Sequence, residues 1–310
     1  MKRMLLLSCL LAALPVHATP SDDVATYLKE KMKQDNIPAL QVAIVRHNKI
    51  VKLASYGIAN IENAIPASDE SVFSINSCTK AFTGVAIMQL VEARKLKIDD
   101  PISQYLGDLP PAWQAVTIKQ VLTHVSGLPN IIDEKENMIG DGSEASAWTK
   151  VKTLPMEFKT GDRFQYNQTN YVILGKIIEK VGGEPFVQFV EDKQFKPAGM
   201  THTRFGDSSD VVPHSAGGYS YLHNVHGIWK KSDQLAAIYV TFPTYFRTAA
   251  GILSTADDIA HWLIALQSGK LLKDKHSLDV MWTPVVLNDG TTAGINDLLN
   301  GEALGWPVTT

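Results

Sequence analysis

Ser77 and Lys80 are a pair of residues whose types and spacing could carry out chemistry. Residues three positions apart on a helix lie on one face, one above the other. A serine hydroxyl is a poor nucleophile until a base takes its proton, and a lysine can be that base once burial has lowered its pKa. The pair therefore predicts a nucleophilic serine with a lysine base. The structural alternative is that Ser77 caps a helix and Lys80 lies at the surface on its first turn.

The sequence that follows favours the catalytic interpretation. We expect Ser77–Lys95 to form one helix, and its stretch from Ala81 to Val91 is apolar on nearly every face. Such a composition is typical of a helix buried on all sides. Burial of the helix start would desolvate Lys80, and the positive end of the helix dipole would lower its pKa further.

The N-terminal residues predict a secretory signal peptide. Lys2 and Arg3 precede an apolar stretch from Met4 to Leu14, and a small-residue cleavage site ends at Ala18. The apolar stretch is too short for a membrane span, which needs about 20 residues, so no stable membrane anchor is expected. Residues 1–18 are therefore predicted to be removed, and the protein is predicted to be periplasmic or secreted.

Removal of the signal peptide would also remove Cys9 and leave Cys78 as the single thiol, so no disulfide within the chain is expected. One helical step turns the Cys78 side chain by about 100° from Ser77. We therefore expect Cys78 to be buried and chemically inert.

Composition excludes several other classes of function. The chain has 310 residues, of which 45% are hydrophobic and 20% charged, so it can bury a large core. A net charge of −3 without a basic cluster makes nucleic acid an unlikely partner. His223 and His226 could suggest zinc, with His202 and His214 nearby, but their setting is loop-like, and we expect no metal and no cofactor.

Periodicity predicts the remaining elements. Asp22–Gln34 is an amphipathic helix, and Leu40–Arg46 with Ile50–Tyr56 is an antiparallel hairpin. The other expectations are an irregular stretch at Gly57–Asp69, a helix capped by Thr117, a long loop or weak helix over Asn130–Lys152, a helix opened by Thr169, a loop or hairpin over Gly206–Ser232, and a helix capped by Thr255.

Several motifs taken together resemble a known family. They are Ser77-Cys78-Thr79-Lys80, Leu96–Pro101, Val121–Leu128, Phe164–Tyr171, and Arg247–Gly251 with Ser254–Asp258. This set is similar to the penicillin-recognising serine hydrolases, in the branch that holds class C β-lactamases, D-alanyl-D-alanine carboxypeptidases, D-aminopeptidases and related esterases. The likeness runs from about Asp22 to the end of the chain.

The resemblance implies an α+β fold of the β-lactamase/transpeptidase type, in which an antiparallel sheet flanked by helices adjoins a mostly helical region, with the site between them. Residues 19–310 would then be one domain. Residues 19–95 and about 245–310 would supply the sheet-and-helix part, and about 96–244 the mostly helical part.

The resemblance also implies site residues. Tyr166 fills the first place of the family's Tyr-x-Asn motif, while Gln168 stands where the asparagine is usual, as a substrate-binding amide. Asn170 is a rival for that role. Either neutral Lys80 or a Tyr166 tyrosinate could take the proton of Ser77, and Tyr166 could then protonate the leaving group.

Two further residues have expected roles near this chemistry. The backbone N–H of Ser77, at the start of a helix, would be one donor of the oxyanion hole. His124 is expected to be hydrogen-bonded at a helix end rather than catalytic.

The resulting hypothesis is an exported serine hydrolase that forms an acyl-enzyme with a small-molecule or peptide substrate, namely a β-lactam, a D-amino-acid peptide or an ester. The alternative is a non-catalytic relative that binds cell-wall peptide or another protein. Leu304–Thr310 looks like the family's Gly-Leu-Gly-Trp stretch, after which the resemblance implies a strand with a Lys-Thr-Gly or His-x-Gly motif. We therefore expect the sequence to be C-terminally incomplete, with its last strands missing.

Overall fold

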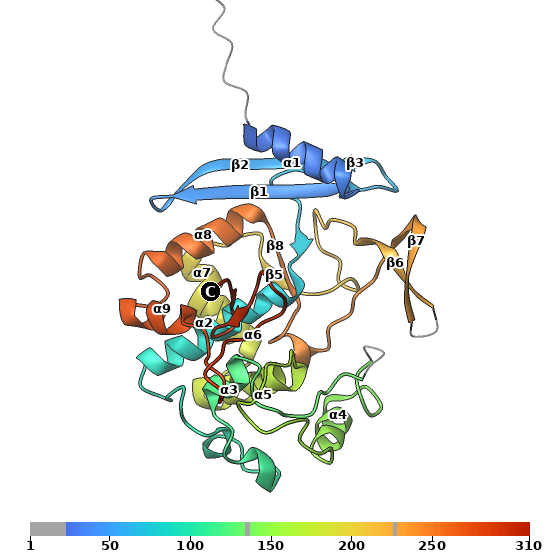
Figure 1. Cartoon of the computed structure of the whole chain (residues 1–310). Coiled ribbons are helices and arrows are strands. Elements are labelled where there is room, and N and C mark those ends of the chain that lie inside the picture. The colour runs from blue at the N-terminus through green and yellow to red at the C-terminus, as the bar shows by residue number, and fades with distance from the viewer. Residues whose placement is uncertain (1–22, 134–136, 226–227) are drawn as a thin grey trace, which may run out of the picture.

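The computed structural model describes residues 23–133, 137–225 and 228–310, and the predicted signal peptide lies outside these residues. Helices and antiparallel strands both occur, so the chain is α+β as predicted (Figure 1). The helices are α1 (Asp23–Gln34), α2 (Thr79–Glu92), α3 (Ile118–Leu122), α4 (Glu144–Val151), α5 (Gln168–Gly182), α6 (Phe186–Val190), α7 (Lys196–Ala198), α8 (Ala256–Gln267) and α9 (Lys275–Trp282). The strands are β1 (Ala39–Arg46), β2 (Lys49–Asn60), β3 (Ile65–Pro66), β4 (Phe73–Ser74), β5 (Arg204–Phe205), β6 (Tyr219–Val225), β7 (Ile228–Ala237), β8 (Ile252–Ser254), β9 (Gly301–Glu302) and β10 (Pro307–Val308).

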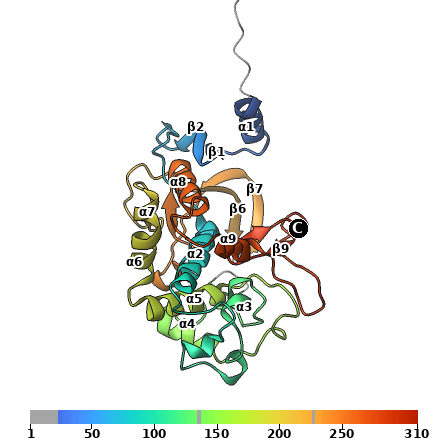
Figure 2. The ribbon, with the colours of Figure 1, turned by 90° about the vertical axis from the view of Figure 1, so that its left-hand side faces the viewer.

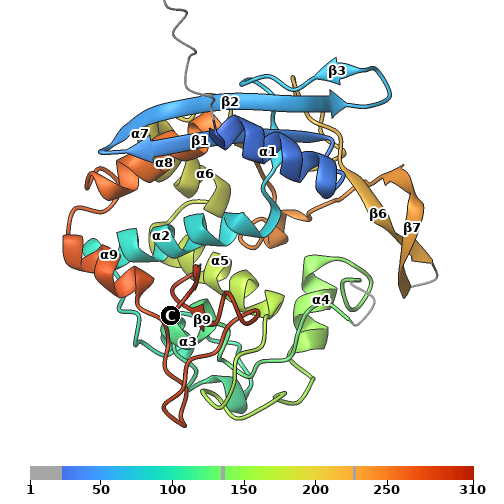
Figure 3. The same ribbon diagram turned by 45° about the horizontal axis from the view of Figure 1, so that its top comes forward.

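The hairpin of β1 and β2 forms one outer layer of the molecule. Its register runs from Ala39 opposite Gly57 to Arg46 opposite Lys49, which confirms the predicted antiparallel pairing. Helix α1 lies along this hairpin, and α8 lies against its opposite face (Figures 1 and 3). The side chain of Gln41 accepts the Ala256 N–H at the start of α8, so the hairpin and that helix are joined by a hydrogen bond.

The expectation of an irregular Gly57–Asp69 is wrong in part. Strand β2 continues to Asn60, and Ile58 and Asn60 pair with the two residues of β3. A register shift between these pairs explains the difference, because a bulged strand interrupts the two-residue alternation that sequence analysis relies on.

Helix α2 lies in the centre of the molecule, with α8 on one side and α5 on the other (Figure 2). Ten of its residues are buried, and they cover every face, as the sequence predicted. The helix starts later than expected, however. Residues Asn76–Cys78 form a separate 3-10 turn, η1, and α2 proper begins only at Thr79.

A small sheet holds the turn that carries Ser77. Strand β8 lies between β4 and β5, and Phe73 of β4 is paired with Ser254. Strand β4 ends only two residues before η1. The hydroxyl of Thr79 also accepts the Ile252 N–H, so β8 supports both ends of this turn.

Helix α5 starts at Gln168, and its N-cap is Asn167 rather than the predicted Thr169. The Asn167 side chain accepts the Asn170 N–H, and asparagine is among the strongest N-cap residues. The cap therefore lies between Tyr166 and Gln168, and it fixes where the helix begins relative to both.

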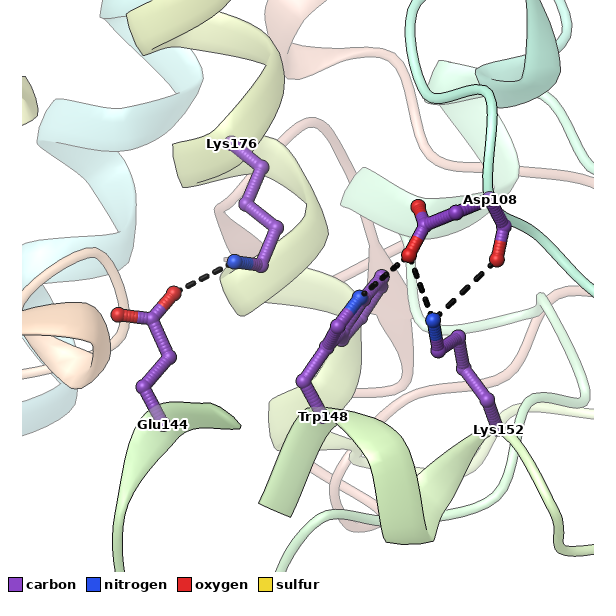
Figure 4. A network of polar contacts seen from close by, with 5 residues as sticks. All are labelled: Asp108, Glu144, Trp148, Lys152 and Lys176. Atoms are coloured by element: carbon purple, nitrogen blue, oxygen red, sulfur yellow. Dashed lines mark hydrogen bonds and ion pairs between the residues drawn. The ribbon is translucent and has the colours of Figure 1, made fainter. Parts of the chain in front are cut away.

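Helix α4 is a regular helix inside the stretch expected to be a loop or weak helix, and Ser143 caps it. Polar contacts connect it to its neighbours (Figure 4). Lys176 of α5 forms an ion pair with Glu144, and Trp148 and Lys152 both donate to the Asp108 carboxylate. These contacts join α4 to α5 on one side and to the connection that carries Asp108 on the other.

Residues 301–305, close to the end of the sequence, lie against the central helix α2. Strands β9 and β10 pair antiparallel, and the segment after β9 packs on α2, where the Leu304 carbonyl oxygen lies 2.3 Å from the position a Cβ of Gly84 would occupy. Among the residues that the structure describes, no helix is long and apolar enough to cross a membrane.

Candidate active site

Ser77 lies at the surface in η1, two residues before the buried part of α2. Asn76, directly before it, has a positive φ of 44°, a backbone conformation that asparagine adopts more readily than most residues. The turn therefore presents the Ser77 hydroxyl at the start of a helix and leaves it open to a cleft.

Lys80 is 4% exposed, and its amine reaches back to Ser77, with Nζ 3.3 Å from Ser77 Oγ. Nζ also donates to the Ala249 carbonyl oxygen at 3.0 Å. The rings of Tyr166 and Tyr171 lie 4.7 and 5.0 Å from it. Burial lowers the pKa of Lys80 to about 7, although the negative charge of Glu302 acts in the opposite direction. A large fraction of the amine is therefore neutral near pH 7.

The ring of Tyr166 faces the Lys80 amine, and the Tyr166 side chain forms a hydrogen bond with that of Ser77. Burial raises the pKa of Tyr166 to about 12, and the hydrogen bond with Ser77 reduces this shift. The phenol therefore keeps its proton at neutral pH. The structure thus brings Ser77, Lys80 and Tyr166 together.

The expectation that Cys78 is buried is wrong, because its side chain is exposed. The reason is the late start of α2. Cys78 belongs to the 3-10 turn that lies at the surface, whereas the buried face of the helix begins one residue later at Thr79. The residue that follows Ser77 in the chain therefore carries an accessible thiol.

Gln168 and Asn170, the two candidates for the substrate-binding amide, lie in different places. Gln168 is the first residue of α5 and lines the same cleft as Ser77. Its Oε1 is buried and has no hydrogen-bond partner among the described residues. Asn170 is fully buried, accepts from the Ser126 hydroxyl and contacts His124, so it supports the site from behind.

His124 lies beneath Tyr166, with the two ring centres 4.5 Å apart. Its Nδ1 accepts the N–H of Asn167, the N-cap of α5. His124 is therefore hydrogen-bonded to the start of α5, and not only at the end of the helix that precedes it, as predicted. Burial and the nearby positive charge of Lys80 hold the pKa of His124 well below its usual value. His124 is therefore a neutral support for Tyr166.

The cleft beside Ser77 has a volume of about 1000 Å³. One wall comes from the connection before α4, and the other from the segment before β8. Residues lining it include Asn130, Met138, Gly140, Phe242, Phe246 and Ala250. Tyr245, from the second wall, donates to the Gly142 carbonyl oxygen, so the two walls are in contact at one end.

Sequence reasoning missed one ionisable residue at this site, Glu302. It is 3% exposed on β9, and burial raises its pKa to about 8, while the charge of Lys80 lowers it. The signal that could have found it is its position, two residues before the Leu304-Gly305-Trp306 stretch that carries the family resemblance.

No grouping of three or more possible metal ligands occurs in the described part of the chain. His226, one of the two histidines of the zinc alternative, lies outside that part.

The fold places this chain among the serine hydrolases related to β-lactamases and penicillin-binding proteins. It belongs to the Beta-lactamase family, whose sequence model matches residues 24–310. Its fold is the β-lactamase/transpeptidase-like fold that the motifs predicted.

Individual relatives are distant. The putative penicillin-binding protein PbpX of Bacillus subtilis (strain 168) is 31% identical over 243 residues, which cover 78% of this chain and 58% of PbpX. Protein flp of Staphylococcus aureus (strain MRSA252) is 25% identical over 245 residues, which cover 77% of this chain and 47% of flp. The chain therefore spans about half the length of the flp relatives. A penicillin binding protein structure from Bacillus halodurans has a TM-score of 0.68 and 29% identity, and the match covers 90% of this chain and 81% of that one.

Proposed function

We propose that this chain is an exported serine hydrolase that forms an acyl-enzyme on Ser77 with a β-lactam, a D-amino-acid peptide or an ester. The observation that carries the proposal is the contact of a buried Lys80 amine, with a pKa near 7, and the Ser77 hydroxyl. A lysine in this state can act as a general base at neutral pH, which an ordinary surface lysine cannot.

The proposed reaction begins when neutral Lys80 takes the proton of Ser77 as Oγ attacks the carbonyl carbon of the substrate. The Ser77 N–H stabilises the resulting oxyanion. Tyr166 gives its proton to the leaving group and regains one from the Lys80 ammonium, and water then hydrolyses the ester on Ser77. The pKa of about 12 for Tyr166 supports this division of roles, because a tyrosinate base would be rare at neutral pH.

In this proposal Gln168 binds the substrate. Gln168 lines the cleft, and a rotation of its side chain would let Oε1, which has no hydrogen-bond partner among the described residues, accept an N–H of a substrate amide. We also propose that residues 1–18 are a signal peptide, so that the mature chain starts at Thr19 and is found in the periplasm or outside the cell. Residues 19–310 then form one domain with the two parts predicted above. Intact mass of the exported protein tests the cleavage site.

The decisive experiment exposes the purified chain to a fluorescent penicillin, an aryl ester and a D-alanyl peptide, and maps any adduct by mass spectrometry. We expect an adduct on Ser77 that is lost in Ser77→Ala. Cys78→Ala is the matched control, because the exposed neighbouring thiol could itself be acylated. An adduct that persists in Ser77→Ala and disappears in Cys78→Ala would contradict the proposal, and binding without any adduct would favour the non-catalytic alternative.

A further inference from the structure

The cleft that opens at Ser77 has two apolar walls to which the proposed reaction assigns no role. Phe242 and Phe246 belong to the wall before β8, and their rings are stacked with centres 6.2 Å apart and planes 12° apart. Ile132 and Met138 belong to the other wall, where an antiparallel bridge pairs their backbones. All four side chains also pack against the main hydrophobic core, so both walls are supported from behind.

Hydrogen bonds hold the backbone of both walls. The Phe242 N–H donates to the Asp207 carboxylate at 2.7 Å. On the other wall, the side-chain oxygen of Asn130 accepts the Ile132 N–H and also the Gln168 N–H at the start of α5. The first bond fixes the wall of Phe242, and the other two fix the wall of Ile132 relative to α5.

The charge of the cleft is negative. In the part of the chain that the structure describes, the charged residues that line it are Asp133 and Asp141, and neither wall supplies a lysine or an arginine there. Hydrogen bonds from Ser143 lower the pKa of Asp141, so this carboxylate is ionised at neutral pH. A carboxylate on a bound molecule would therefore lose water to apolar surface and a like charge, without a cation to replace it.

The proposed reaction indicates which part of a substrate meets these walls. The leaving group must lie beside Tyr166, which gives it a proton, and Tyr166 does not line the cleft. The acyl part, on the other side of the reacting carbonyl, then extends from Ser77 into the cleft. It also stays on Ser77 after the leaving group has gone, so the cleft contacts it in both steps of the reaction.

We propose that the two apolar walls bind the acyl part of the substrate, so that the chain prefers esters or amides of an uncharged, apolar acid, and that Phe242 is a specificity-determining residue. This inference rests on the proposed function, since that function places the acyl group on Ser77. An apolar pocket discriminates by size, because each methylene that it buries changes kcat/KM by roughly 10- to 200-fold. It discriminates against charge because a carboxylate gives up its hydration there.

The test compares kcat/KM of the full chain for the p-nitrophenyl esters of acetate, butyrate and succinate, after the rate of Ser77→Ala has been subtracted. In the succinate ester a carboxylate replaces the terminal methyl group of butyrate. We expect butyrate to exceed both acetate and succinate by at least about tenfold. Asp141→Asn keeps an oxygen that can accept the Ser143 N–H. It should raise the succinate-to-butyrate ratio by about threefold, the size expected for an exposed charge.

The variant that tests the wall is Phe242→Ala. It should reduce the preference for butyrate over acetate to about twofold or less, because the longer acyl chain loses its apolar contact. The acetate rate reports how much of the variant is folded. Leu263→Ala is the matched control, because Leu263 is a partly buried apolar residue of α8 that does not line the cleft. It should leave the ratio unchanged. A ratio that Phe242→Ala also leaves unchanged, or succinate hydrolysed as fast as butyrate, would overturn the inference.

Absence of Ser77-dependent turnover for all three esters would contradict the proposed function, and binding then tests the inference by itself. The probe is the ¹³C-labelled methyl group of Met138 in Ser77→Ala, assigned with Met138→Leu and titrated with butyranilide and with succinanilic acid. We expect butyranilide to shift this signal and succinanilic acid to bind at least about tenfold more weakly. Equal affinity of the two compounds, or no shift with butyranilide, would overturn the inference whatever the enzyme assays show.

Discussion

Lys80 Nζ lies 4.7 Å from the centre of the Tyr166 ring, while the same nitrogen is 3.3 Å from Ser77 Oγ. The lysine amine thus contacts both the proposed nucleophile and the proposed proton donor. The pKa values of the two groups are shifted in opposite directions, to about 7 for Lys80 and about 12 for Tyr166. Environments that separate two pKa values in this way are typical of a base and an acid in one site.

The first prediction concerns the pH dependence of acylation. Because Lys80 must be neutral to act, the acylation rate should rise as pH increases through about 7. Lys80→Ala and Tyr166→Phe should each slow acylation by about 10²- to 10⁴-fold while the chain stays folded. Stopped-flow labelling with a penicillin at several pH values measures this. Near-normal turnover of Tyr166→Phe would show that a group other than Tyr166 acts as the acid.

The second prediction concerns stability. The pKa of Lys80 is lower in the folded chain than in the unfolded chain. The buried amine therefore lowers the free energy of unfolding most at pH values below 7, where it is charged in both states. This cost disappears as the pH rises toward the ordinary pKa of lysine. Lys80→Met should therefore raise the free energy of unfolding, by about 2 kcal/mol at pH 6 and by less at pH 9. Urea unfolding at the two pH values measures the difference.

The control for this experiment is Lys33→Met, at an exposed position on α1. Its effect should stay within about 0.5 kcal/mol at both pH values. A Lys80→Met variant less stable than the unsubstituted chain at pH 6 would show that the buried ammonium is not a cost to folding.

A third prediction separates Gln168 from Asn170. Gln168→Ala should raise KM for an amide substrate about tenfold and change stability little, because Oε1 has no partner within the described structure. Asn170→Ala should lower the free energy of unfolding by about 1–3 kcal/mol, because it leaves the buried Ser126 hydroxyl without its acceptor. Steady-state kinetics and urea unfolding of both variants give the comparison, and the reverse pattern would assign the substrate amide to Asn170.

A fourth prediction tests how closely the segment after β9 packs on α2. Alanine is normally a better helix residue than glycine. Gly84→Ala should nevertheless destabilise the chain by about 1–3 kcal/mol, because its Cβ would lie 2.3 Å from the Leu304 carbonyl oxygen. Gly107→Ala, with nothing within 4 Å of its added Cβ, is the matched control. Thermal unfolding of the two variants measures the change in stability. A Gly84→Ala variant more stable than the unsubstituted chain would show that the segment after β9 does not pack on α2.

The parts of the site that could be predicted from sequence are those with local signals. The apolar run of α2 predicted its burial, and the spacing of Ser77 and Lys80 predicted their contact. Cys78 was misplaced because a 3-10 turn and a helix start look alike in sequence, although they expose different side chains. Glu302 was missed because a strand of two residues has no periodicity, and its approach to α2 depends on contacts between residues more than 200 positions apart.

The pocket around the Lys80 amine is assembled from Tyr166, Tyr171 and Ala249, which lie far from Lys80 in the chain. During synthesis these residues leave the ribosome long after Ser77 has emerged. Until the last of them arrives, Lys80 is an ordinary hydrated ammonium that cannot remove a proton from the serine. The nascent chain would therefore carry the proposed nucleophile in an unreactive form until the fold that supplies its proposed base is complete.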